Sequence, residues 1–167
     1  MRAFQIQDVK VFMSHLLISH TFDRFLLHEA SISTFSTFSI DGRLNKDYFS
    51  YDEEDNETAD TLKYPYWEQI RPFCFSLIKG KKTPVSLKVV FQLSPGGLTK
   101  LLVSNHLSLK PEEVGGLFLN IRYDGQKLIA TTGTSLKVFS MDKTLDQIWD
   151  NLITNFLKKH EIPFTTE

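Results

Sequence analysis

The chain has 167 residues, of which 41% are hydrophobic and 23% charged, and its formal net charge is −1. Such values are typical of a soluble globular domain, and the balance of 19 basic and 20 acidic side chains argues against a dedicated binder of nucleic acid or anionic membranes. The chain has one cysteine, Cys74, and its first residues lack the apolar core of a signal peptide. It has no apolar run near the ~20 residues that span a bilayer. These features indicate a cytoplasmic protein without a membrane partner.

The chain begins with a pattern that predicts a strand, a helix and then extended chain. Phe4 and Ile6 alternate with polar neighbours, and Asp8 is placed to cap the amphipathic helix that follows. Residues 24–40 interleave hydrophobic side chains with Ser and Thr, which predicts extended chain. The alternation slips near Ser36-Thr37, so we expect a bulge or tight turn there.

The next segment predicts a hairpin, a loop and a helix. Asp41-Gly42 is a two-residue hairpin signal, with residues 43–49 as the returning strand. Residues 52–60 are acidic and lack apolar anchors, which predicts a solvated loop. Apolar side chains at helical spacing over 67–77 predict a helix, which Pro72 should kink or divide.

The second half opens with the clearest strand pattern, over residues 85–93. The turn at 94–97 leads into a short helix, and a glycine-containing loop at 111–116 leads into a strand over 117–123. Asp124-Gly125 predicts a second hairpin.

The chain after that hairpin predicts strands and a final helix. A returning strand starts at Leu128, and the cluster at 131–135 predicts a turn into a further strand that reaches Val138. Apolar residues over 145–157 follow the i, i+3, i+4, i+7 spacing of an amphipathic helix, and Thr144 with Gln147 predicts a capping box at its start.

Short words recur in the same order in the two halves of the chain, at a nearly constant offset of about half its length. The pairs are Phe4-Gln5-Ile6 with Phe91-Gln92-Leu93, Leu16-Leu17-Ile18-Ser19 with Leu101-Leu102-Val103-Ser104, Ile40-Asp41-Gly42 with Tyr123-Asp124-Gly125, and Trp67-Glu68-Gln69-Ile70 with Trp149-Asp150-Asn151-Leu152. This repetition predicts an α+β fold of internally duplicated β-α-β-β(-β)-α units, about residues 1–80 and 81–167. We expect an antiparallel sheet with helices packed on one side, in a single domain over 1–167.

Motifs for chemistry are scarce, and the sequence assigns no catalytic, cofactor-binding or metal-binding residue. None of the five histidines forms a His-Glu-x-x-His pair, and no Gly-x-Ser-x-Gly turn presents a serine nucleophile. Cys74 lies in an apolar helical run, where a buried, inert thiol is expected. The hydroxyl-rich segments 31–39 and 131–135 could bind phosphate or sugar, although Ser and Thr are also ordinary strand and turn residues.

Four basic residues flank the two Asp-Gly pairs. Arg43 and Lys46 follow the first pair, and Arg122 and Lys127 lie on either side of the second. Related positions in a duplicated fold could join them into a surface for an anionic partner. Charges that keep an edge hairpin soluble explain the same residues equally well.

Several segments together resemble a small bacterial family known only as a domain of unknown function. They are Glu29-Ala30-Ser31-Ile32, Ile40-Asp41-Gly42-Arg43-Leu44, Thr131-Thr132-Gly133-Thr134-Ser135 and Phe156-Leu157-Lys158-Lys159-His160-Glu161-Ile162. The resemblance covers nearly the whole chain, and it implies no catalytic residue.

The duplicated units are also similar in architecture to the domains of sliding DNA clamps, whose short helices face DNA. The corresponding helices here would span 8–19 and 97–104, and their only cations are Lys10 and Lys100. That is a thin lining for phosphate contacts.

These observations leave three hypotheses for function. The leading one is a non-catalytic cytoplasmic binding or scaffolding protein whose partner is an unidentified protein. The alternative is a clamp-like, DNA-associated factor. The third is a small-molecule-binding protein or an enzyme, with a pocket where the two halves meet.

Overall fold

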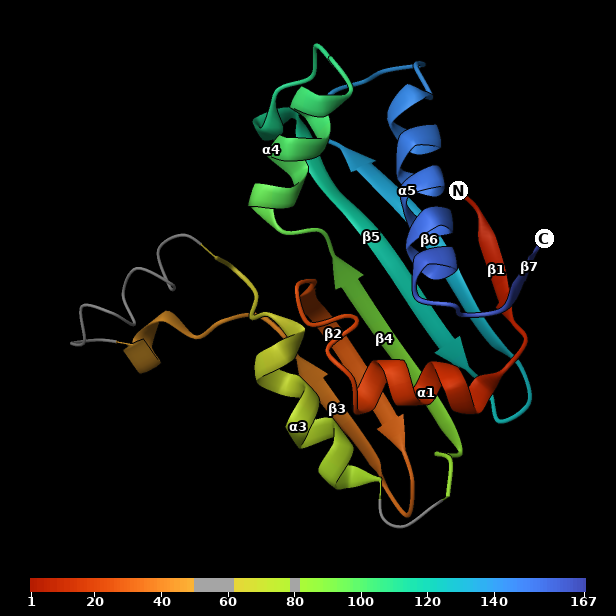
Figure 1. The fold of residues 1–167 in the computed structure, drawn as a ribbon. Coiled ribbons are helices and arrows are strands. Elements are labelled where there is room, and N and C mark those ends of the chain that lie inside the picture. The colour runs from red at the N-terminus through yellow and green to blue at the C-terminus, as the bar shows by residue number, and fades with distance from the viewer. Residues whose placement is uncertain (50–61, 79–81) are drawn as a thin grey trace.

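An antiparallel sheet of seven strands forms the centre of the computed structural model, which describes residues 1–49, 62–78 and 82–167 (Figure 1). The strand order is β3-β2-β4-β5-β6-β1-β7, so strands from both halves of the chain share one sheet. The strands are β1 (Ala3–Ile6), β2 (Leu26–Ser33), β3 (Thr37–Asp41), β4 (Ser86–Gln92), β5 (Val114–Tyr123), β6 (Leu128–Leu136) and β7 (Phe164–Thr166).

The helices cover one face of this sheet. They are α1 (Val9–Leu17), α3 (Trp67–Leu77), α4 (Pro95–Ser104) and α5 (Thr144–Lys159), with short 3-10 turns at η1 (Lys46–Phe49) and η2 (Pro111–Glu113). Figure 1 shows α1, α3 and α5 in front of the sheet and α4 beyond its upper end. The α+β class and the antiparallel sheet with helices on one side are therefore confirmed.

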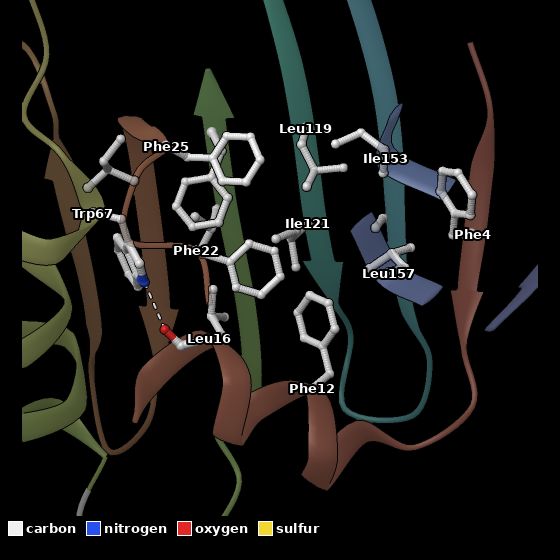
Figure 2. Close-up of a cluster of buried hydrophobic side chains, with 14 of the residues drawn as sticks. Phe4, Phe12, Leu16, Phe22, Phe25, Trp67, Leu119, Ile121, Ile153 and Leu157 are labelled. Atoms are coloured by element: carbon white, nitrogen blue, oxygen red, sulfur yellow. Dashed lines mark hydrogen bonds between the residues drawn. The ribbon is translucent and has the colours of Figure 1, made fainter. Parts of the chain in front are cut away.

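The hydrophobic core fills the space between the helices and the sheet (Figure 2). On β4, the side chains of Leu87, Val89 and Phe91 point toward the helices and are at most 3% exposed. Lys88 and Gln92 alternate with them and are only partly buried, although Val90 between these two is 8% exposed. This period of two is what a strand shows when one face is packed and the other faces solvent.

Two buried tryptophans connect helices to the rest of the core. Trp67 in α3 donates its indole N–H to the carbonyl oxygen of Leu16 in α1 at 2.7 Å (Figure 2), and Trp149 in α5 donates to the carbonyl oxygen of Phe118 in β5 at 2.9 Å. Both side chains are fully buried. Because a buried N–H without an acceptor is costly, these bonds fix α3 against α1 and α5 against β5.

The predicted helix start at Asp8 is confirmed, the predicted turn at 94–97 is already the start of α4, and the predicted cap at Thr144 is wrong. Asp8 accepts a hydrogen bond from the backbone N–H of Val11 at 3.1 Å, and Ser94 accepts one from Gly97 at 3.2 Å. At α5, however, the carboxylate of Asp142 accepts from the backbone N–H of Thr144 at 2.9 Å. Thr144 is already helical, so it does not form the predicted capping box.

The first Asp-Gly pair does not make a hairpin. The turn between β2 and β3 lies at residues 34–36, close to the predicted irregularity, and β3 ends at Asp41. Gly42 donates its N–H to the carbonyl oxygen of His28, and a Cβ on Gly42 would lie 2.0 Å from the carbonyl oxygen of Leu27. This glycine therefore serves a close backbone approach to β2, and the chain leaves the sheet for η1, so the predicted returning strand over 43–49 is wrong.

The second Asp-Gly pair makes the predicted hairpin between β5 and β6. Gly125 has φ +97°, in the left-handed region that such a turn needs. β6 then continues unbroken through residues 131–134, which pair with β5 and in part with β1. The predicted turn and further strand are wrong, because threonines that suit a turn suit a two-sided strand as well.

The other expectations for the first half have mixed outcomes. Helix α3 runs through Pro72 without being divided.

Each half has the element order β-α-β-β-α, but β4 pairs with β5 whereas β1 pairs with β6 and β7 and not with β2. The pairing therefore does not confirm the duplication, and clamp-like architecture is likewise not confirmed. The acidic segment 52–60 lies outside the described residues.

A buried ion pair joins the segment after α1 to helix α3. The guanidinium of Arg71 donates to both carboxylate oxygens of Asp23, at 2.8 and 3.2 Å, and His20 Nδ1 lies 2.6 Å from the same carboxylate. Asp23 is 4% exposed. Burial alone would raise its pKa, but the hydrogen bonds from Arg71 and His20 outweigh it, so the pKa of Asp23 lies below its usual value.

We expect Asp23→Asn to destabilise the protein by about 2 kcal/mol at pH 7, because Arg71 would lose a charged, buried acceptor. The lowered pKa means that this stabilisation is present above about pH 4 and is lost as the pH falls through the folded-state pKa. Urea unfolding at pH 7 and pH 3 should show that the difference in the free energy of unfolding between variant and wild type is smaller at pH 3. The exposed Asp47→Asn is the control, and a gap independent of pH would contradict the role of the ionised carboxylate.

Candidate binding site on the uncovered sheet face

The face of the sheet away from the helices carries an open hollow of about 760 Å³. Its floor is formed by β2, β4, β5 and β6, and one end by the β5–β6 turn. The lining residues are His28, Glu29, Lys88, Val90, Phe118, Asn120, Arg122, Asp124, Lys127, Ile129 and Thr131. Strand alternation gathers these side chains, because each takes the position opposite to a core residue.

The strand register sets which of these side chains are neighbours. Lys88 on β4 lies directly opposite Arg122 on β5, and Asn120 on β5 lies opposite Thr131 on β6. Directly opposite side chains have Cβ atoms about 5 Å apart. The hollow therefore has one row with two adjacent cations and another with an amide beside a hydroxyl.

The adjacent cations are only partly neutralised by carboxylates. Glu29 Oε1 lies 3.0 Å from Lys88 Nζ. Within 1–49, 62–78 and 82–167, no carboxylate forms an ion pair with Arg122 or Lys127, and both side chains are exposed. Like charges that face each other directly destabilise a sheet. Glu29 offsets part of this repulsion at Lys88, whereas Arg122 has no such ion pair among the described residues.

The remaining carboxylate of the hollow is occupied by its own turn. Asp124 Oδ1 accepts hydrogen bonds from the backbone N–H groups of Lys127 at 2.7 Å and Gln126 at 2.8 Å. These bonds, that of Lys127 first, hold the pKa of Asp124 below its usual value. The carboxylate thus orders the turn that carries Lys127.

Aromatic rings lie at the other end of the hollow. The ring centroids of Phe118 and His28 are 5.6 Å apart in an edge-to-face arrangement, and Tyr64 stacks on His28 at 4.3 Å. Phe118 is partly exposed, although its neighbours Leu117 and Leu119 on β5 are only 1% exposed. The aromatic end and the cationic end of the hollow are therefore built on the same strand.

Glycines leave room around Phe118. A Cβ on Gly116 would lie 2.6 Å from Cζ of Phe118, so the ring leans along β5 over Gly116. On β6, Gly133 lies directly opposite Phe118, and a Cβ there would meet only the side-chain nitrogen of Asn120, at 3.9 Å. The ring position depends on a glycine at 116, whereas Gly133 leaves one flank of the ring without a neighbouring side chain.

The structure separates the four basic residues predicted as an anionic-partner surface. Arg122 and Lys127 line the hollow together. Arg43 lines a different depression beside α3, and Lys46 is exposed at the start of η1. The alternative explanation, charges at a sheet edge, does not fit Arg122, because β5 is the central strand of seven.

Among the other residues of the hollow, Thr131 belongs to the hydroxyl-rich segment 131–135 named in the sequence, whereas Lys88, Asn120 and Phe118 were not predicted. Lys88 and Asn120 occupy polar positions in the two strands predicted over 85–93 and 117–123, so the alternation alone could have pointed to them. Phe118 lies between two leucines, and a run of three apolar residues does not show which one faces solvent.

Comparison with known proteins identifies a family. Residues 15–165 match the family of unknown function DUF5721. The chain belongs to the DUF5721 family. No curated protein and no solved structure matches it. The predicted resemblance to a domain of unknown function is confirmed, whereas a bacterial origin and a likeness to sliding clamps stay predictions.

In this DUF5721 member, the described residues offer few groups for other chemistry. Among them, no cluster of three or more His, Cys, Asp or Glu side chains could hold a metal ion, and no helix is long and apolar enough to cross a membrane. The thiol of Cys74 is buried in α3, and burial raises its pKa to about 12. A thiolate nucleophile at this position is therefore disfavoured.

We expect the Cys74 thiol to react at least about a hundredfold more slowly with an aromatic disulfide reagent in the native protein than in guanidinium chloride at pH 8. The raised pKa leaves very little thiolate, and the reagent cannot reach the buried sulfur. Absorbance of the released thiolate measures both rates. Similar rates would mean an accessible, activated thiol and would restore Cys74 as a candidate nucleophile.

Proposed function

We propose that the protein is a non-catalytic binding protein of the cytoplasm that holds an anionic partner against the uncovered face of its sheet. The observation that carries this proposal is the direct pairing of Lys88 with Arg122 on the neighbouring strands β4 and β5 of an open hollow, with Lys127 at its end. The single cysteine is the ground for the cytoplasmic location.

The arrangement suits an anion for two physical reasons. Repulsion between the paired cations is relieved when a negative group lies between them, so binding is favoured relative to the free protein. The planar guanidinium of Arg122 can also donate two parallel hydrogen bonds to a phosphate or carboxylate.

The hollow favours binding over catalysis. Its ionic and hydrogen-bonding groups are spread over a broad floor made by β2, β4, β5 and β6, and it opens to solvent along the sheet. An active site usually brings a nucleophile into contact with a base inside a cleft that excludes water. A broad charged floor is the form expected for an extended partner, either an acidic segment of a protein or a nucleic acid.

We expect the double variant Arg122→Glu/Lys127→Glu to lose at least about tenfold in affinity for inorganic polyphosphate, because attraction at two positions becomes repulsion. The salt dependence of binding should also become shallower, by roughly 1.4 in the slope of log affinity against log salt. Isothermal titration calorimetry between about 50 and 200 mM salt measures both quantities.

The double variant Arg43→Glu/Lys46→Glu is a matched control, since it changes the net charge equally away from the hollow. Its affinity should stay within about twofold of the wild type. Equal losses in the two double variants would indicate a general charge effect without a defined site. A wild type that does not bind polyphosphate at low salt would remove the proposal.

A further inference from the structure

We propose that the anionic partner is a single-stranded nucleic acid, with one base stacked on Phe118 and its phosphates held by Arg122 and Lys127. This inference rests on the function proposed above and adds the chemical class of the ligand. It needs an aromatic ring, hydrogen-bonding groups and cations at one solvent-facing surface, and β5 carries all three.

Phe118 presents a partly exposed aromatic ring on the open face of the sheet. Every other large apolar side chain from Leu117 to Tyr123 on β5 is at most 8% exposed, whereas the ring of Phe118 is partly open to solvent in the middle of the sheet. The position opposite it on β6 is Gly133, which has no side chain to cover that flank. A flat aromatic surface beside an empty position is suited to a planar ring from a ligand.

The surroundings hold this ring in place. The rings of Phe118 and His28 pack edge to face, Tyr64 stacks on His28, and the Phe118 ring leans over Gly116. The backbone carbonyl of Phe118 is fixed from the other side of the sheet by the indole of Trp149. A ring held this firmly loses little conformational entropy when a base stacks on it.

The spacing of the side chains along β5 fits an extended single strand. Phe118, Asn120 and Arg122 face the hollow at intervals of two residues, about 6.7 Å apart. This is about twice the 3.4 Å between successive nucleotides on one strand of a duplex. An extended single strand with separated bases therefore matches the strand better than stacked, paired bases do, and the bases of a duplex cannot reach Phe118.

The hollow combines cations with an aromatic ring and hydrogen-bonding side chains. The cations alone would serve an acidic peptide equally well, but such a peptide would leave the aromatic end of the hollow uncovered. A nucleic acid uses both ends, and the amide of Asn120 and the hydroxyl of Thr131 lie side by side where they can contact base edges or sugar. The single strand is therefore the occupant that accounts for the most residues of the hollow.

The test compares two labelled oligomers of equal length and charge, a twelve-residue oligothymidylate and its abasic counterpart, by fluorescence anisotropy with the full chain. Wild type should bind the oligothymidylate roughly 5- to 100-fold more tightly, the range expected for stacking of one base. Phe118→Leu should abolish this preference and leave the affinity for the abasic oligomer unchanged, because the cations remain.

Two glycine substitutions provide a second variant and its control. Gly116→Ala should reduce the preference, since the new methyl group would occupy the place of the Phe118 ring, whereas Gly96→Ala, in α4 away from the hollow, where a Cβ meets no atom within 4 Å, should have no effect. Circular dichroism confirms that each variant is folded. Should Phe118→Leu fail to fold, the comparison of the two alanine variants still decides the outcome.

The failure of this inference can be told from the failure of the proposed function. Equal binding of both oligomers by wild type, with polyphosphate binding still dependent on Arg122 and Lys127, overturns base stacking and leaves an anion-binding surface. Tighter binding of a glutamate-rich peptide than of the oligothymidylate assigns the surface to an acidic protein instead. Absence of polyphosphate binding overturns both proposals together.

Discussion

Burial of one face of the sheet is the constraint on which the rest of this structure depends. All of the described α-helices contribute buried side chains to one core on that face, so the core-facing positions of the central strands are mostly apolar. On β5 these are Leu117, Leu119 and Ile121, each at most 1% exposed. The residues between them are free of packing requirements and can be selected for another purpose. The core and the proposed binding surface thus lie on opposite faces of the same strand.

The helix layer in turn depends on a few directed polar contacts, because apolar packing alone does not fix the position of a helix along the sheet. Asp23 with Arg71 fixes α3 against the segment after α1, and Trp149 fixes α5 against β5. The second contact has a consequence for the open face. The carbonyl that Trp149 binds belongs to Phe118, so the core positions the backbone of the residue that we place in the binding site.

Local patterns predicted the elements well, and their failures share a physical cause. Alternation identified β4, and helical spacing identified α5, because both patterns depend on neighbours in sequence. The two Asp-Gly pairs look alike, but Gly42 is needed for a close approach to β2 and Gly125 for a left-handed turn, and only the tertiary structure distinguishes them. The candidate binding site was not predicted from the sequence for the same reason. Lys88 and Arg122 become neighbours only through the register of β4 on β5, which no local pattern contains.

The asymmetry of the sheet explains why one half of the chain provides most of the hollow. If β1 had paired with β2 as β4 pairs with β5, two equivalent surfaces could have formed. Instead β1 lies on the far side of β6, and the chain leaves the sheet after β3, so Arg43 lies in a loop. Arg122 is on the central strand, hydrogen-bonded on both sides, and its spacing from Phe118 is therefore fixed before any ligand arrives. A partner that binds there does not have to order the strand, and this pre-organisation favours the central strand over the loop as the binding surface.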